Sequence, residues 1–192
     1  MDQLLKEFAR IKREHAESVL ARSARVVLGS SVIRVFDSGT KPGLVRILEG
    51  VAIDELKRIR SQTAFKKFFE RELARVSRGV RRLNPDNARI YPGYKWGHST
   101  KVLCLFLRTV VLESDLLPHS AITRLRPLLY APIDGVIIHR LQDLEVELPF
   151  QRIKDIDSQR KFYKIQDLLG RASRRAEVPR IWFDDNWVGN RA

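Results

Sequence analysis

The chain has 192 residues, 44% of them hydrophobic, and its 36 Lys and Arg residues outnumber 23 Asp and Glu residues to give a net charge of +13. This length and composition predict one globular domain with a buried interior, and the single cysteine, Cys104, excludes a disulfide framework or a cysteine metal cluster within one chain. No apolar run reaches membrane-spanning length and the first residues lack the apolar core of a secretion signal, so we expect no membrane partner and a cytoplasmic, nucleoid-associated protein.

The positive charge is concentrated in the first half of the chain. Residues 1–100 contain 21 Lys and Arg against 11 Asp and Glu, whereas residues 101–192 contain 15 against 12. Such a surplus attracts polyanions, so nucleic acid is the leading partner. Charge alone is also compatible with membrane lipids or an acidic protein as the partner.

Three elements are predicted before residue 44. Residues 2–24 carry apolar residues at helical spacing, which predicts an amphipathic helix that packs on the rest of the protein. Residues 26–36 are richer in β-branched side chains and predict a short strand or an extended crossing. Residues 37–43 form the clearest loop, and any linker between two lobes is expected there.

Residues 51–80 predict two helices that meet near Arg60, with a strongly basic polar side. Eleven Lys and Arg residues lie within positions 57–89 against three acids, which favours a phosphate-facing surface. The alternative is a solvated helix face with ion pairs such as that between Lys66 and Glu70. The aromatic residues of this segment are expected in the core: Phe65, Phe68 and Phe69.

The central stretch, residues 91–140, combines a glycine turn, a helix start, a lysine and a distant aspartate. Pro92-Gly93 and Gly97 predict the turn, and Ser99 and Thr100 are positioned to cap the apolar helix that follows. Free N–H groups at a helix start attract phosphate. Lys101 is predicted in the first turn of this helix, and Asp134 follows 33 positions later, after Pro132.

Further helices are predicted on the C-terminal side. One spans residues 113–130, one runs from Asp134 to about Leu144, and one contains Phe162 and ends at Gly170. The tail, residues 180–188, is aromatic and acidic.

The residues Pro92-Gly93, Gly97, Lys101-Val102 and Pro132-Ile133-Asp134 resemble the helix-hairpin-helix DNA glycosylases, including the 8-oxoguanine glycosylase branch. The resemblance covers about 50 residues. It implies a mainly α-helical single domain over residues 1–192, with two helical lobes, residues 1–40 with 131–192 and residues 44–130, and an active site in the cleft between them.

The resemblance also assigns site residues. Lys101 and Asp134 would be catalytic, and the hairpin region would bind the nucleic acid through Gly93, Lys95, Gly97, His98, Ser99 and Thr100. A late helix would line the base pocket with Phe183, Asp184 and Trp187. The alternative for these last residues is that they close the core.

The implied chemistry needs both members of the pair and neither metal nor cofactor. A neutral Lys101 amine would attack C1′ of the deoxyribose and become a Schiff base, after which proton abstraction expels the 3′ phosphate. Asp134 would stay ionised beside the positive charge that develops on the sugar. The partner would be double-stranded DNA with an extruded base, and an oxidised purine is the implied substrate.

Two other functions remain open for the sequence. When each residue is considered alone, Lys101 can be interpreted as a solvent-exposed lysine at a helix start, and Asp134 can be interpreted as a helix N-cap after a proline turn. The chain is then a non-catalytic nucleic-acid-binding module, such as a subunit of a repair or anti-phage defence system. In the third interpretation it is a structural or interaction domain whose basic surface meets an acidic protein, and the sequence does not specify any protein partner.

Overall fold

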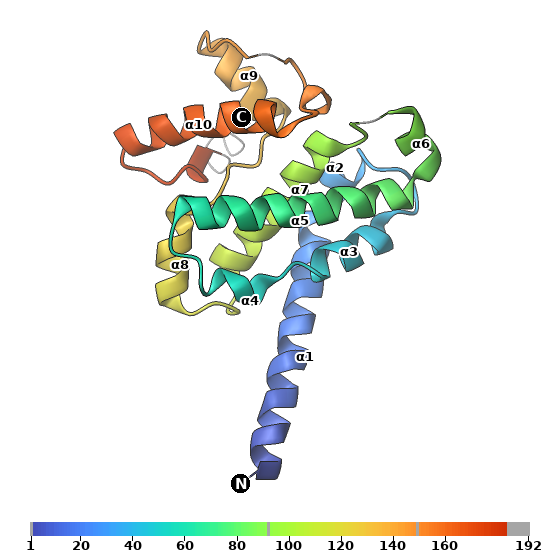
Figure 1. The fold of residues 1–192 in the computed structure, drawn as a ribbon, viewed down its shortest axis with the longest axis vertical. Helices are drawn as coiled ribbons and strands as arrows, with labels where there is room; N and C mark the ends of the chain where they lie inside the picture. Colours follow the sequence, from blue (N-terminus) through green and yellow to red (C-terminus); the bar gives the residue numbers. More distant parts are fainter. Residues whose placement is uncertain (1, 92, 149, 184–192) are drawn as a thin grey trace.

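The computed structural model describes residues 2–91, 93–148 and 150–183, and every regular element in this part of the chain is helical (Figure 1). The predicted mainly α fold is therefore confirmed. The elements are α1 (Asp2–Val27), α2 (Ser30–Ile33), α3 (Lys41–Glu49), α4 (Ile53–Leu56), α5 (Gln62–Leu83), α6 (Pro85–Ile90), α7 (Trp96–Glu113), α8 (His119–Leu125), η1 (Arg126–Leu128), α9 (Gly135–Asp143), η2 (Ile153–Asp155) and α10 (Gln159–Arg175).

The long helix α1 packs with only part of its length. Its C-terminal part contacts α3 and α7 and buries Val19, Ala24 and Val27. Its N-terminal part projects from the body (Figure 1), and Leu4 and Phe8 are 56% and 62% exposed there. The expectation that this amphipathic helix packs on the protein is wrong for its first part.

The strand expected over residues 26–36 is also wrong. The chain continues α1 to Val27 and forms α2 after Gly29. Leu28, Val32 and Phe36 are buried at helical spacing, so tertiary packing overrides the β propensity of the branched residues. The predicted loop at 37–43 is shorter than expected because α3 already begins at Lys41, with Pro42 in its first turn.

Helices α5 and α7 form the centre of the molecule, with α9 and α10 stacked above them in Figure 1. The two helices predicted around Arg60 are present as α4 and α5, and the Ser61 hydroxyl caps α5 by accepting a hydrogen bond from the Ala64 N–H at 3.2 Å. The predicted core aromatics are buried, and the Phe69 and Phe162 rings stack with centroids 5.5 Å apart. One continuous hydrophobic core links these helices. The division into two lobes stays a prediction.

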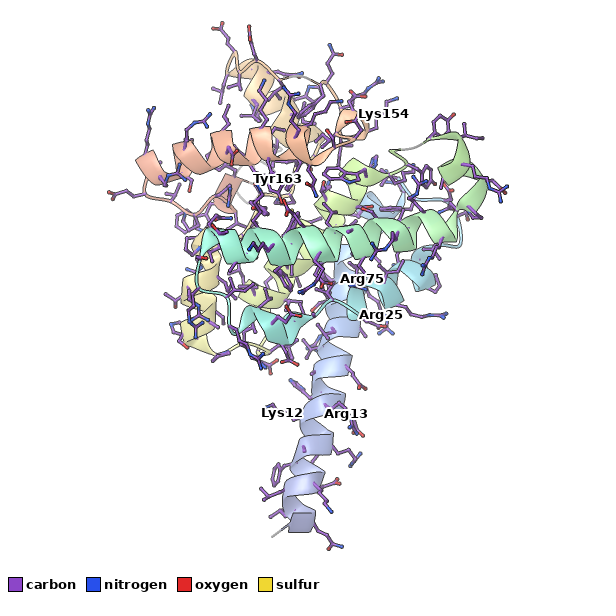
Figure 2. The ribbon with its side chains drawn as sticks, viewed as in Figure 1. Lys12, Arg13, Arg25, Arg75, Lys154 and Tyr163 are labelled. Carbon is purple, nitrogen blue, oxygen red and sulfur yellow. The ribbon has the colours of Figure 1, made fainter. Side chains whose placement is uncertain are left out.

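Some of the basic side chains of α5 stabilise the fold through contacts within the protein. The buried Glu72 carboxylate binds Arg71 at 3.0 Å and Arg75 at 2.9 Å. Arg75, which is labelled in Figure 2, also donates to the Ile47 carbonyl. The predicted pair of Lys66 and Glu70 is present at 3.9 Å. These arginines are therefore held by protein groups, and this use of the charge was not predicted.

The C-terminal helices are present, but the boundaries of two of them differ from the prediction. The helix expected over residues 113–130 begins only at His119, because α7 continues to Glu113. The helix expected before Asp134 is present as α8 followed by η1, and the helix expected after Asp134 is α9. However, α10 does not end at Gly170 but continues to Arg175. Gly170 instead allows the Arg180 guanidinium to approach, because a Cβ there would lie 3.3 Å from its Nη1. Among the helices described, none has the length and apolar character needed to cross a membrane.

Candidate active site

Lys101 and Asp134 lie side by side although 33 residues separate them. The Lys101 ammonium donates to Asp134 Oδ2 at 3.1 Å, and the two side chains are 22% and 15% exposed. Asp134 Oδ1 accepts a hydrogen bond from the Ile137 N–H at 3.0 Å and so caps α9. The predicted convergence of the pair is confirmed, and so is the N-cap position of Asp134.

The sequence predicted Lys101 in the first turn of its helix, but the structure places it in the second turn. Helix α7 begins earlier, at Trp96, because Lys95 adopts a left-handed backbone (φ 53°) that ends the preceding turn. Ser99 and Thr100 therefore lie inside the helix. Their hydroxyls donate to the carbonyls of Lys95 and Gly97 and cap no N–H group, and both side chains are buried. The expected capping is wrong, and burial leaves neither side chain at the surface where a phosphate would bind.

Gly97 has a packing role. A Cβ at this position would overlap the Ile153 carbonyl oxygen and lie 2.9 Å from the Ile156 carbonyl oxygen. Only glycine lets η2 approach α7 this closely. Because Ile153 also lines the pocket that Lys101 borders, Gly97 shapes the site without contacting solvent.

The segment that carries Asp134 is held from α10. The buried Gln166 amide donates to the Ala131 carbonyl at 2.7 Å and accepts from the Ala131 N–H at 3.1 Å. The Arg180 guanidinium donates to the Leu129 carbonyl at 3.2 Å. These contacts fix the backbone that leads into Asp134.

Replacing Gln166 by Leu is expected to lower the free energy of unfolding by about 2–5 kcal/mol, because the buried N–H and carbonyl of Ala131 would both lose their partner. Urea denaturation followed by circular dichroism measures the change. Gln159→Leu, at the exposed start of the same helix, is the control and should change stability by less than about 0.5 kcal/mol.

Lys101 and Asp134 border a pocket of about 320 Å³. Its size is at the lower end of the range for small-molecule sites. The other lining residues come from the segment after α1, from α7, from α9 and from η2: Val32, Val35, Phe36, His98, Gly135, Val136, His139 and Ile153.

A larger groove of about 870 Å³ adjoins this pocket and shares residues with it, among them His98, Gly135 and His139. Its wall is basic, with Asp157 as the one acid among the described lining residues. The cations are Arg34, Lys95, Arg152 and Lys154. Gly93 and Lys95, two of the predicted nucleic-acid-binding residues, also line this groove.

His98 lies where the groove and the pocket meet. Its side chain is 8% exposed, its ring packs against Phe36 with centroids 6.2 Å apart, and its Nδ1 has no hydrogen-bond partner among the described residues. Burial, together with the positive charges of Lys95 and Lys101, lowers the pKa of His98 to about 4. The imidazole is therefore neutral at pH 7. It was predicted as a nucleic-acid-binding residue, and its burial beside Lys101 was not foreseen.

The low pKa of His98 predicts a loss of stability in acid. The folded protein keeps this imidazole neutral down to about pH 4, whereas the unfolded chain binds the proton from its ordinary pKa of 6.5. The stabilisation is therefore complete above pH 6.5 and is lost as pH falls toward 4, with a magnitude of about 2–3 kcal/mol. Urea denaturation at a series of pH values should show this slope in the wild-type protein and a flatter one in His98→Gln.

The predicted base-pocket residues do not join this site. Asp184 and Trp187 lie outside the described residues. Phe183 packs against the hydrophobic core and is not among the described residues that line the Lys101 pocket. A separate hollow of about 720 Å³ lies near α10 and shares no described lining residue with the Lys101 pocket.

Among the described residues that line the groove and the pocket, four basic or imidazole side chains were not predicted: Arg34, His139, Arg152 and Lys154. They come from three segments far apart in the sequence, and none has a local motif. The one signal in the sequence that could have identified them as site residues is that each carries a basic or imidazole side chain. Comparison of the chain with models of protein families, with curated proteins and with solved structures finds no match.

Proposed function

We propose that the protein is a DNA N-glycosylase with associated abasic-site lyase activity, and that Lys101 is its nucleophile. The observation that carries this proposal is the Lys101–Asp134 pair, 3.1 Å apart, on the wall of a pocket that joins a basic groove. An amine and a carboxylate in contact are the two groups that this reaction requires.

Each member of the pair has a role in the reaction. The Lys101 amine, once it has lost a proton, attacks C1′ and displaces the base, and the opened sugar then forms a Schiff base with it. The Asp134 carboxylate stabilises the positive charge that develops on the sugar. The Ile137 N–H fixes that carboxylate through its other oxygen, so its position does not depend on Lys101 alone.

The groove supports double-stranded DNA as the partner. Among the described lining residues four cations stand against one acid, and phosphate contacts supply a large share of the affinity of proteins for DNA. A base that leaves the duplex would enter the adjoining pocket, which costs a few kcal/mol that the backbone contacts offset. An oxidised purine as the lesion rests on the resemblance of the sequence alone.

Borohydride trapping tests the proposal. The protein is incubated with duplexes that contain an abasic site, 8-oxoguanine or only normal bases, and sodium borohydride reduces any Schiff base to a stable adduct. We expect an adduct with the abasic duplex that mass spectrometry maps to Lys101. The absence of any adduct at low salt, where the protein binds DNA, would exclude the lyase function.

The second candidate is a non-catalytic nucleic-acid-binding module. One observation favours it: the ion pair and the α9 cap satisfy Lys101 and Asp134 without a ligand. In that case DNA binding weakens steeply with salt and no adduct forms. Fluorescence anisotropy over a salt series, run beside the trapping assay, distinguishes the two functions.

A further inference from the structure

His98 is the group in the candidate site that the fold leaves unsatisfied. It precedes Lys101 by three residues on α7, and positions three apart lie on the same face of a helix, so both side chains line one pocket. Buried polar atoms almost always have a hydrogen-bond partner, yet Nδ1 of this 8% exposed imidazole has none among the described residues. Because Nδ1 is itself fully buried, a ligand in the pocket would meet the other ring nitrogen, Nε2.

The other groups that face the pocket have fixed partners or a positive charge. Asp134 uses Oδ2 for Lys101 and Oδ1 for the Ile137 N–H. Lys95 and Lys101 are the cations beside His98 that, after burial, lower its pKa to about 4. With its proton on the buried Nδ1, the neutral imidazole offers Nε2 to the pocket as a proton acceptor at pH 7, beside the Asp134 carboxylate that Lys101 and the Ile137 N–H already hold.

We infer that His98 is the base of the elimination step, an inference that rests on the proposed function. Once Lys101 Nζ is bonded to C1′ as an iminium ion, His98 Nε2, the ring nitrogen that is not fully buried, takes a proton from C2′. The electrons of that C–H bond form a C1′–C2′ double bond, and the C1′–N electron pair returns to nitrogen. Those electrons then expel the phosphate from C3′, which leaves with the electron pair of the C3′–O bond while the proton stays on the imidazole.

The test separates adduct formation from strand cleavage. With an abasic duplex, His98→Gln is expected to give the wild-type amount of borohydride-trapped adduct but strand cleavage that is slower by about 10²-fold or more. His119→Gln removes an exposed imidazole on α8, which is not among the described residues that line the pocket or the groove, and it should cleave at the wild-type rate. Normal cleavage by His98→Gln would overturn the inference, whereas absence of adduct in the wild-type protein would overturn the proposed function itself.

A second variant covers the case in which His98→Gln fails to fold. His98→Ala leaves a space beside Lys101, and added imidazole should restore cleavage in proportion to its neutral form. The trapped adduct reports that the site is intact in the same sample. Restoration by imidazole supports His98 as the base, and an adduct that forms normally without any restored cleavage contradicts it.

A different observation carries a second inference, which concerns the projecting part of α1. Leu4, Phe8 and Ile11 are exposed and follow one another at spacings of four and three residues, the pattern of a coiled-coil seam. Glu7 flanks this seam on one side and Lys12 flanks it on the other. Leu5 is also exposed, at 61%, and widens the apolar stripe on the flank of Lys12. Charged residues of opposite sign still border the stripe on its two sides, an arrangement typical of helix pairing.

We propose that this seam binds the same seam of a second copy of the chain in a parallel pair. In a parallel coiled coil, a residue on the Glu7 flank faces the residue five positions later on the opposite flank of the partner, which is Lys12. The pairing therefore forms two ion pairs by symmetry. Glu7 would exchange its contact with Arg10 in its own helix for this one. Lys12 and Arg13 lie on opposite sides of the projecting helix (Figure 2).

Sedimentation equilibrium tests the pairing. We expect a concentration-dependent dimer that Phe8→Glu converts to a monomer, while Arg13→Gln on the opposite face has no effect. The single charge reversals Glu7→Lys and Lys12→Glu should each weaken the dimer, and the double reversal should restore it. A monomer at all concentrations, or sedimentation with anionic vesicles that depends on Phe8, would overturn the proposal.

Discussion

Replacing Lys101 by Gln is expected to abolish the covalent adduct with abasic DNA and to slow strand cleavage by about 10³-fold or more. An amide nitrogen does not attack C1′ and forms no Schiff base. The fold should survive, because Asp134 keeps its hydrogen bond to the Ile137 N–H and stays partly exposed. Single-turnover cleavage of an abasic duplex, resolved on a denaturing gel, measures the loss.

Two controls separate the loss of the amine from the loss of a positive charge. Lys101→Arg keeps a cation opposite Asp134, but a guanidinium is not a nucleophile, so this variant should also form no adduct. Lys154→Gln removes a cation from the groove, so it should weaken DNA binding and its salt dependence while the adduct still forms. An undiminished adduct in Lys101→Gln would show that another amine is the nucleophile.

Replacing Gly97 by Ala is expected to lower the free energy of unfolding by about 3 kcal/mol or more. The added Cβ would overlap the Ile153 carbonyl oxygen, and a backbone oxygen cannot move aside as the end of a side chain can. Relief of the clash would push η2 away from α7 and so distort the groove. Urea denaturation measures the stability, and anisotropy measures DNA binding.

Gly135 provides the matched control for Gly97. It is the first residue of α9 and also borders the pocket, but a Cβ there would meet nothing within 4 Å. Gly135→Ala should change the stability by less than about 0.5 kcal/mol. If Gly97→Ala were as stable as Gly135→Ala, the close approach of η2 to α7 would be incorrect.

Local patterns in the sequence were sufficient for the helices with long apolar repeats and for the Asp134 cap. Phe65, Phe69 and Leu73 recur at helical spacing along α5, and all three are buried. Asp134 follows a proline turn and precedes an apolar run, which is the local arrangement of a helix start. These features depend on neighbours within a few residues, so one chain segment is enough to predict them.

Patterns failed where a contact from a distant segment decides the structure. The β-branched residues of 26–36 are helical because the body of the protein buries them on one side. Helix α7 begins at Trp96 because of the backbone of Lys95, and the apolar face of α1 is exposed over its first turns among the described residues. Propensity does not report which side chains the rest of the protein buries, because that depends on residues that the sequence separates. The left-handed backbone of Lys95 is local, but a lysine gives no sequence signal for it.

The sequence by itself determined a helical, strongly basic protein and selected Lys101 and Asp134 as a pair, because helix periodicity, net charge and cap motifs are local or additive properties. Only the tertiary structure decided that the two side chains lie 3.1 Å apart, that His98 is buried beside them, and that Gly97 brings η2 against α7. The physical reason is that distances, burial and close packing depend on how separate helices meet.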